Sequence, residues 1–477
     1  MALAASIAIN RVDPVPFEDA HMGMSNMAGP SLRQWVGRAV LGVGASIAAA
    51  SCCSAASNPI GLAFDPDFGS GGFSELPLHV SADKTSSIVP IGVIHLDTSG
   101  GYIAASLQQV NNLPRMVLTR YTEAGALDLS WGSQGSSMPA LPSPYVGGNG
   151  SPDAIRLVAG SENGQDIFYL AFSLPNGANF FVGVAKFVAS GAFDASFGFG
   201  GYAASSLPVS APGGLLELRG AAFTRVFGLP VLVVIVAAAN NRLVFSRAHG
   251  SGAATLSDQG GGSSIQFGNS PNILQVRTNG PNHIELVGNT GNEALYADYD
   301  AGTLTLVSRT FRFPCANGST ASAIDAIERP AGWNGDVLVM GRTACITEGA
   351  TSVVARMANI ATSPNPVWLA QTEVGSLCTP GGMTLCTGVM LAYSDARPGI
   401  AITMTPRNKL VPVNTVTGRP MAATPVNALS GQFYAQHSSY RGLVFRYPRL
   451  VGFGLDVAAR KGLAGLFVDG LFIDGFQ

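Results

Sequence analysis

Charged side chains are scarce in this chain of 477 residues, where Asp, Glu, Lys and Arg together make up 12%. The formal net charge is −2, and the basic residues form no stripe or tail. This excludes nucleic acid as a partner, because binding it requires a concentrated positive surface. The apolar run Gly228–Ala239 is too short to span a bilayer and is bounded by Gly and Asn, so it predicts a buried strand. We expect no membrane span in the mature chain.

Catalytic sequence motifs are also missing. The chain has no HExxH, no GxSxG, no GxxxxGK and no GxGxxG between a strand and a helix. Its mature histidines are scattered, without a carboxylate at motif spacing, and we expect each to be a satisfied or surface residue. They are His79, His95, His249, His283 and His437. No residue is predicted to be catalytic or to bind a cofactor.

Cysteines are few, and four of the six lie beyond the N-terminal region. Sequence order pairs Cys315 with Cys345 and Cys378 with Cys386. An even number in a chain with an export signal favours disulfides. A zinc site is the rival interpretation, but CxxC spacing is absent and no histidine lies nearby.

Calcium is the one metal that the sequence leaves open. Asp65 and Asp67, and likewise Asp298 and Asp300, present alternate carboxylates of the kind that hard cations prefer. The EF-hand pattern is missing, and carboxylates in turns commonly cap backbone N–H groups. We therefore expect no metal or cofactor, with calcium as the alternative.

The first 56 residues have the pattern of an N-terminal extension followed by a signal peptide. Residues 33–56 have a basic start, an apolar centre and small residues at the end. A basic region normally lies close to the first residue, so we expect translation to begin at Met22, Met24 or Met27. Cys52 or Cys53 is an alternative lipidation site. The mature protein is expected outside the cytoplasm: in the periplasm, on the cell surface or secreted.

Glycine and proline are abundant, with 59 and 29 residues. Together with the few charges they predict an all-β fold of short buried strands joined by tight turns, because helical signals are scarce. Besides Gly228–Ala239, the strand candidates are Met116–Tyr121, Asp166–Phe172, His283–Gly288, Asp336–Gly341 and Leu443–Tyr447.

A motif recurs three times, as FDPDFGSGG, LDLSWGSQG and FDASFGFGG. The copies begin at Phe64, Leu127 and Phe193, and a period of about 60 residues indicates an array of supersecondary units. Upstream of the second and third copies stand a cation, an aromatic residue, three residues and Gly-Ala. An eroded fourth copy begins at Arg247 and fades by Gly262.

Each part of the motif has a local physical reason. Its aspartates are expected to cap turns, its aromatic residues to be buried between units, and its glycines to supply positive φ. The structural residues of the motif are Phe64, Asp65, Phe68, Gly69, Leu127, Asp128, Trp131, Gly132, Phe193, Asp194, Phe197 and Gly198.

This pattern resembles the delta-60 repeat family of exported bacterial proteins, from about Phe64 to Gly262. The resemblance implies a propeller-like fold and an extracytoplasmic location, and it transfers no catalytic residue. Repeats of this length suit the four-stranded blades of a β-propeller.

The period favours seven blades, with six as the alternative, in a domain over residues 57–455. Weaker copies occur at Tyr299–Leu304, Ala355–Thr362 and Arg446–Asp456. Since the chain begins with the end of a motif and closes with the start of one, its terminal segments are expected to share a blade.

Residues 456–477 are expected to form a C-terminal tail. Its aromatic-aliphatic-Asp-Gly unit occurs twice, at Phe467–Gly470 and at Phe472–Gly475. It resembles a short tail of some exported gammaproteobacterial proteins, and the alternative is a closing strand or a frayed end.

Two functions remain open. The sequence favours a monomeric, non-enzymatic propeller that serves as a scaffold or binding module for a protein or glycan. The alternative is a secreted propeller hydrolase or lyase acting on saccharide, whose carboxylates would meet from different blades about 5 to 10 Å apart. The eroded half of the repeat array, after Gly262, is where we expect the binding residues.

Overall fold

A computed structural model describes most of residues 62–468, with longer gaps at 80–88, 141–154, 209–216, 250–263, 375–389 and 426–442 and shorter gaps in other loops. The described residues fold into strands and turns without a helix, as the composition predicts. The expected signal peptide and the pair of Cys378 and Cys386 lie outside the described residues.

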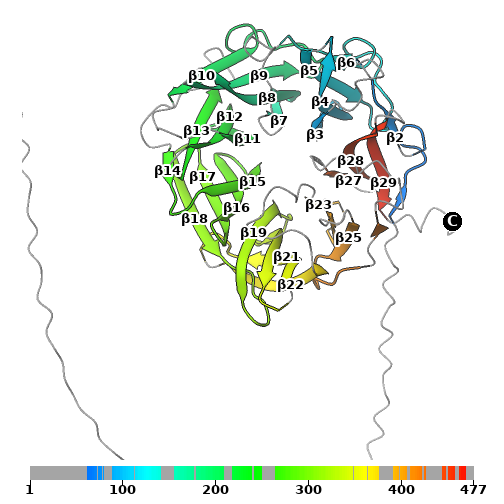
Figure 1. The fold of residues 1–477 in the computed structure, drawn as a ribbon. Coiled ribbons are helices and arrows are strands. Elements are labelled where there is room, and N and C mark those ends of the chain that lie inside the picture. The colour runs from blue at the N-terminus through cyan, green and yellow to red at the C-terminus, as the bar shows by residue number, and fades with distance from the viewer. Residues whose placement is uncertain are drawn as a thin grey trace, which may run out of the picture. The chain divides into compact units, whose positions relative to one another are not determined.

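Seven antiparallel sheets form from the described strands, and we number them as blades 1 to 7 (Figure 1). Blade 1 contains β3 (Val89–His95), β4 (Tyr102–Val110), β5 (Leu113–Tyr121) and β6 (Ser136–Ser137). Blade 2 contains β7 (Ile155–Glu162), β8 (Gln165–Asn176), β9 (Asn179–Val188) and β10 (Tyr202–Pro208). Blade 3 contains β11 (Glu217–Val226), β12 (Leu229–Ala238), β13 (Arg242–His249) and β14 (Ser264–Gln266).

The remaining blades follow the same plan. Blade 4 contains β15 (Pro271–Thr278), β16 (His283–Thr290), β17 (Glu293–Asp300) and β18 (Thr305–Phe311). Blade 5 contains β19 (Ser319–Glu328), β20 (Val337–Cys345), β21 (Gly349–Ala358) and β22 (Asn365–Val374). Blade 6 contains β23 (Met390–Tyr393), β24 (Ile400–Met404), β25 (Lys409–Asn414) and β26 (Thr424–Pro425). Blade 7 contains β27 (Leu443–Arg446), β28 (Arg449–Asp456) and β29 (Lys461–Val468), completed by β1 (Leu62–Phe64) and β2 (Phe73–Glu75).

The blades form a closed ring. The first strand of each blade packs against the first strand of the next, from β3 through β7, β11, β15, β19, β23 and β27 back to β3 (Figure 1). The N-terminal strands β1 and β2 both pair with β29, near the other end of the chain. The terminal segments therefore share a blade, and both this closure and the seven-bladed β-propeller are confirmed.

The apolar run expected as a buried strand is β12, which shows why such strands are apolar throughout. Val231 to Val236 are fully buried. Leu232, Val234 and Val236 pack into the core between blades 2 and 3, whereas Val231, Val233 and Ile235 pack into the core between blades 3 and 4. An inner strand of a propeller is covered on both faces, so the usual alternation of polar and apolar residues is absent.

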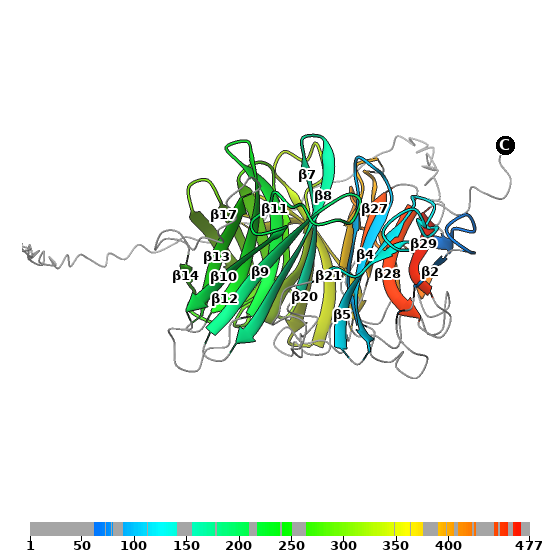
Figure 2. The same ribbon diagram turned by 90° about the horizontal axis from the view of Figure 1, so that it is seen from above.

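The other strand candidates also lie in strands: β5, β8, β16, β20 and β27. The strands run between two faces of the ring (Figure 2). In each blade, the end of the third strand pairs with the start of the second strand. The hairpin between the first and second strands and the turn that follows the third strand therefore lie on the same face of the ring. We refer to it as the motif-turn face.

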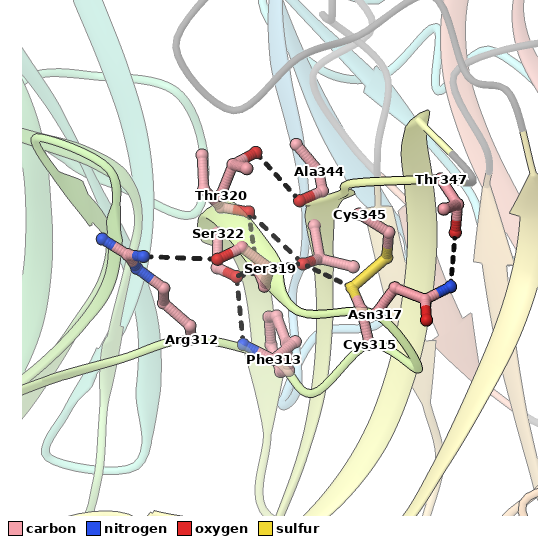
Figure 3. Close-up of a disulfide and its surroundings, with 12 residues drawn as sticks. Arg312, Phe313, Cys315, Asn317, Ser319, Thr320, Ser322, Ala344, Cys345 and Thr347 are labelled. Carbon is pink, nitrogen blue, oxygen red and sulfur yellow. Dashed lines mark hydrogen bonds between the residues drawn. A yellow bond between two sulfur atoms is a disulfide. The ribbon is translucent and has the colours of Figure 1, made fainter.

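A disulfide joins Cys315 to Cys345, confirming the first cysteine pair (Figure 3). It links the connection between blades 4 and 5 to the end of β20. Asn317 Nδ2 donates to Thr347 Oγ1 at 2.9 Å beside it, and Thr320 Oγ1 donates to the backbone oxygen of Ala344 at 3.1 Å.

One expected boundary and one expected motif copy change near the C-terminus. β29 lies within the segment expected as a tail, and it is the third strand of blade 7, so the propeller extends from 455 to Val468. This is the closing-strand alternative. The weak copy at Arg446–Asp456 is not a motif, because its two ends lie on β27 and β28 rather than on a third strand and the following turn. The copies at Tyr299–Leu304 and Ala355–Thr362 do occupy that position.

Candidate functional site

The repeat aspartates cap turns on the motif-turn face. Each accepts, through Oδ1, a hydrogen bond from the backbone N–H two residues further along, which defines an Asx turn. The pairs are Asp65 with Asp67 (2.9 Å), Asp128 with Ser130 (3.1 Å) and Asp194 with Ser196 (3.0 Å).

Their second oxygen, Oδ2, pairs with a cation. Arg120 Nε lies 3.2 Å from Asp128, and Lys186 Nζ lies 2.7 Å from Asp194. In these two copies the cation precedes the aromatic residue at or next to the end of the third strand. Burial would raise the pKa of Asp194, but the hydrogen bonds from Lys186 and Ser196 lower it.

In blade 7 the cation comes from the neighbouring strand. Phe64 pairs with Leu466 just as Leu127 pairs with Tyr121, so Gly465 occupies the place that Arg120 has in blade 1. Arg449 of β28 supplies the missing charge, and its Nε and Nη2 both lie 2.5 Å from Asp65 Oδ2.

The motif aromatics bind each blade to the next. Phe68 contacts Gly125 of blade 1, where an added Cβ would lie 2.5 Å from the ring, and Trp131 contacts Gly191 of blade 2 at 2.2 Å by the same measure. Trp131 also donates from Nε1 to the backbone oxygen of Ala189 at 2.8 Å. Because only glycine fits against these rings, the spacing between aromatic and glycine follows the blade period.

The other motif residues have structural positions too. Phe68, Trp131 and Phe197 are buried, and Leu127 and Phe193 are partly buried against the core. The glycines that follow the aromatics have φ of +59°, +58° and +55°; they are Gly69, Gly132 and Gly198. Phe64 ends β1. In the eroded copy, Arg247 donates to the backbone oxygen of Ala301 in blade 4 at 2.9 Å.

Two histidines have carboxylate partners that sequence spacing did not reveal. His95 Nε2 lies 2.5 Å from Glu123 Oε1 and its Nδ1 lies 3.1 Å from Asp97. Burial would raise the pKa of Glu123, but the hydrogen bond and charge of His95 lower it. His283 Nδ1 lies 3.1 Å from Asp298 in the adjacent strand. The pairing register of the strands would have revealed these partners, because they lie on paired strands or in neighbouring turns.

The remaining histidines carry less information. His79 Nε2 lies 2.9 Å from Ser136 Oγ, and burial lowers its pKa. His249 ends β13, and His437 lies outside the described residues.

Three of the four carboxylates considered for calcium have protein partners, and the fourth, Asp67, is exposed. Asp65 is paired with Arg449 and Asp298 with His283, as described above. Asp300 accepts the backbone N–H groups of Gly302 and Thr303. Within the residues that the structure describes, no group of three or more His, Cys, Asp or Glu side chains is arranged to hold a metal ion.

A polar network lies between blades 4 and 5, in the half of the chain where the motif has faded. It consists of Arg277, Glu285, Tyr296, Glu328 and Arg329. Glu285 is fully buried, and its Oε1 accepts hydrogen bonds from Tyr296 at 2.8 Å and from Arg329 Nη2 at 2.5 Å. Arg277 Nη1 donates to Glu328 Oε2 at 2.6 Å. We refer to it as the blade 4–5 network.

This network shifts the ionisation of its members. Burial, followed by the charge of Glu285, raises the pKa of Tyr296. Burial also raises the pKa of Glu328, against the opposing charge of Arg277. In the adjacent hairpin, burial raises the pKa of Asp298 although His283 opposes it. The network therefore brings carboxyl groups from two blades together, but Arg329 and Arg277 partner both of its glutamates.

Large apolar side chains are exposed on the motif-turn face of three consecutive blades. Leu129 in blade 1 is 68% exposed, Phe199 in blade 2 is 93% exposed and Phe227 in blade 3 is 80% exposed. Leu229, beside Phe227, is 58% exposed. Arg225, next to this hairpin, donates to the backbone oxygen of Ser161 at 2.7 Å, so the hairpin tips of blades 2 and 3 are neighbours.

Phe227 has an unusual backbone conformation for an aromatic residue. Its φ is +50°, a left-handed value that is strained for a bulky side chain. Its N–H donates to Asn282 Oδ1 of blade 4 at 3.2 Å, which fixes the hairpin tip. Strained exposed aromatics are more typical of binding surfaces than of scaffolding. Sequence analysis missed these residues because single apolar residues in turns carry no periodic signal.

No helix among the described residues is long and apolar enough to cross a membrane. No protein-family model matches the chain, and no curated protein does.

Several solved structures are similar to this chain at low identity. One chain of a mitotic checkpoint complex is 10% identical with a TM-score of 0.43, and the alignment covers 94% of this chain and 99% of that one. A protein from Lactobacillus plantarum is 11% identical with a TM-score of 0.43, over 70% and 84% of the two chains. BamB from Moraxella catarrhalis is 11% identical with a TM-score of 0.38, over 82% and 99%.

Proposed function

We propose that this chain is an exported, non-enzymatic β-propeller that binds a protein partner on the motif-turn face. The observation that carries the proposal is the exposure of Leu129, Phe199, Phe227 and Leu229 on three consecutive blades. Exposed large apolar groups on one surface are typical of protein interaction sites. A protein partner suits this surface better than a glycan, because two of the four side chains are leucines, which offer a sugar neither a stacking ring nor a hydrogen bond.

The use of the motif carboxylates supports a binding role. Asp65, Asp128 and Asp194 are each engaged by a backbone N–H and a cation, which leaves them no free part in acid–base chemistry. We also propose export and relationship to the delta-60 repeat family. The motif supports the relationship, and the Cys315–Cys345 disulfide supports export, since disulfides persist in oxidising compartments.

Affinity recovery from envelope extracts, with variants as bait, tests the binding surface. The test variant is Phe199→Ser with Phe227→Ser, and the matched control is Ile346→Ser, an apolar residue 65% exposed on the β20–β21 hairpin of the opposite face. We expect one protein to be recovered by the parent and the control and lost with the double variant. A partner retained equally by all three would contradict the proposed surface.

A saccharide hydrolase or lyase is the second candidate, and the blade 4–5 network is the observation that favours it. Glu328 is 26% exposed and has a raised pKa, as a general acid would. A glycan array followed by a reducing-end assay with Glu328→Gln separates the candidates. Turnover that this substitution abolishes would replace the binding proposal.

A further inference from the structure

The outer strands of the propeller differ in how they limit pairing with other chains. A free strand edge presents unpaired N–H and C=O groups, and proteins usually shorten, bend or interrupt such edges. The outer strands β6 and β26 have two residues each, and β1, β2 and β14 have three. These are too short to accept an added strand.

The longer outer strands carry other interruptions. β22 has ten residues but contains Pro366 and shifts register at two places against β21. β10 has seven residues and ends with Pro208. Proline removes a backbone donor, and a bulge disturbs the spacing of the remaining donors.

β18 has neither device. It has seven residues, contains no proline, and pairs with β17 in unbroken register from Thr305 to Phe311. Its residues are partly or fully exposed, with Val307 at 47%. Among the outer strands that the structure describes, β18 is the one long edge without proline or bulge.

The side chains along this edge indicate the chemistry of an occupant. Val307 and Arg309 are two residues apart, so they lie on the same face of the strand, and both are exposed. Arg309 Nη1 donates to the backbone oxygen of Ser308 at 3.2 Å. Across the described residues, no carboxylate forms an ion pair with Arg309.

We propose that β18 binds an extended peptide segment of another protein by adding it as a fifth strand to blade 4. The peptide carries an apolar residue opposite Val307 and an acidic residue opposite Arg309, two positions apart. Backbone hydrogen bonds supply affinity and the alternating side chains supply specificity, as in other cases of strand addition. This site is distinct from the motif-turn face, and it does not depend on the function proposed for that face.

Fluorescence anisotropy with synthetic peptides tests the proposal on the full mature chain. The probe has the sequence STETVTS, which places Val opposite Val307 and Glu opposite Arg309 in a strand antiparallel to β18, and one control carries Lys in place of Glu. Two further analogues carry N-methyl groups on alternate residues, in opposite phase. Because only one phase directs its N–H groups toward β18, we expect at least a tenfold loss for one analogue and little change for the other.

Charge exchange tests the register. Arg309→Glu should weaken the Glu peptide about fivefold and strengthen the Lys peptide by a similar factor, since cross-strand charge pairs are worth up to about 1 kcal/mol. The matched control is Arg419→Glu, an exposed arginine in the turn before β26 of blade 6, which should change neither.

Three outcomes would overturn the proposal. One is equal binding of the two N-methylated analogues, and another is no effect of Arg309→Glu. The third is self-association of the chain that Arg309→Glu abolishes in size-exclusion chromatography, because the edge would then be covered by a second copy.

Discussion

Arg449 and Asp65 are 384 positions apart in the chain and form an ion pair through Nε and Nη2 at 2.5 Å each. Asp65 is fully buried. Arg449 Nη1 also donates to the backbone oxygen of Glu123 in blade 1 at 2.8 Å. One guanidinium thus joins the N-terminal strands, the C-terminal strands and the first blade at the closure of the ring.

Removing this arginine should destabilise the propeller strongly. Arg449→Ala leaves the buried carboxylate of Asp65 without its cation, and the loss of one partner of a buried pair costs about 3 to 5 kcal/mol. Arg120→Ala is the matched control: it also removes a hydrogen bond to the backbone oxygen of Ala189, but its partner Asp128 is 23% exposed and water can replace the cation there, so we expect a smaller cost of about 1 to 2 kcal/mol. Urea unfolding measures both, and equal costs would show that Arg449 is not the critical brace.

A double variant tests whether the unpaired charge of Asp65 causes the loss of stability. Adding Asp65→Asn to Arg449→Ala removes the unpaired charge while keeping a side-chain oxygen for the turn, so it should restore part of the lost stability. If the double variant is less stable than Arg449→Ala, the ion pair is not the cause.

The ring could be predicted from the sequence because the motif contains the residues that form the contact between neighbouring blades. The fit of Trp131 against Gly191 requires one aromatic and one glycine in each period, and that regularity is visible in a single chain. The shared terminal blade follows from the same regularity. The closing strand β29 is not recognisable in the sequence, because Gly465 stands where the motif has a cation.

The blade 4–5 network could not be predicted in the same way. Glu285 and Arg329 come from different blades and are joined by no repeated spacing, so their contact appears only when the blades pack. The position of Arg449 was missed for a related reason: it compensates from β28 for a cation absent from β29. The expectation that the binding residues lie in the eroded half stays a prediction; the blade 4–5 network lies in that half, whereas the exposed Phe199 and Phe227 lie on blades 2 and 3.

The motif glycines should be intolerant of any side chain. In Gly191→Ala the new Cβ would lie 2.2 Å from the ring of Trp131, in addition to the strain of φ +82°. Gly164→Ala is the control, because its φ is +74° and no atom lies within 4 Å of the new Cβ. We expect about 1 to 2 kcal/mol for the control and about 1 to 3 kcal/mol more for Gly191→Ala. Equal losses in urea unfolding would mean that the contact is not tight.

Asp166 should contribute to acid sensitivity. It lies on β8 and accepts the backbone N–H groups of Thr98 at 3.0 Å and Ser99 at 2.5 Å in blade 1. Burial would raise the pKa of Asp166, but these hydrogen bonds lower it below its usual value near 4. The unfolded chain therefore takes up the proton first as the pH falls.

The stabilisation from Asp166 is thus complete above about pH 4 and is lost as the pH falls through the lower pKa of the folded state. Asp166→Asn should lower the melting temperature at pH 7 and flatten its dependence on pH between about 4 and 2. Asp67→Asn, at an exposed position in the first motif turn, is the control and should leave the slope unchanged. An unchanged slope in Asp166→Asn would contradict the assignment.

Replacing Phe227 with asparagine should increase the stability of the chain and weaken its binding to the partner. The tip of its hairpin is Phe-Gly, and both residues have positive φ, a conformation for which Asn-Gly is strongly preferred. Phe227→Asn should therefore stabilise the chain by about 0.5 to 1 kcal/mol, because asparagine adopts this conformation at lower cost. The same variant should lose the partner recovered by the parent chain, since it removes an aromatic side chain that is 80% exposed.

Thermal unfolding and affinity recovery, performed on one preparation, measure the two effects. A variant that is more stable and still binds fully would show that Phe227 is not part of the interface, and a destabilised variant would show that its packing near Gly302 outweighs the backbone strain.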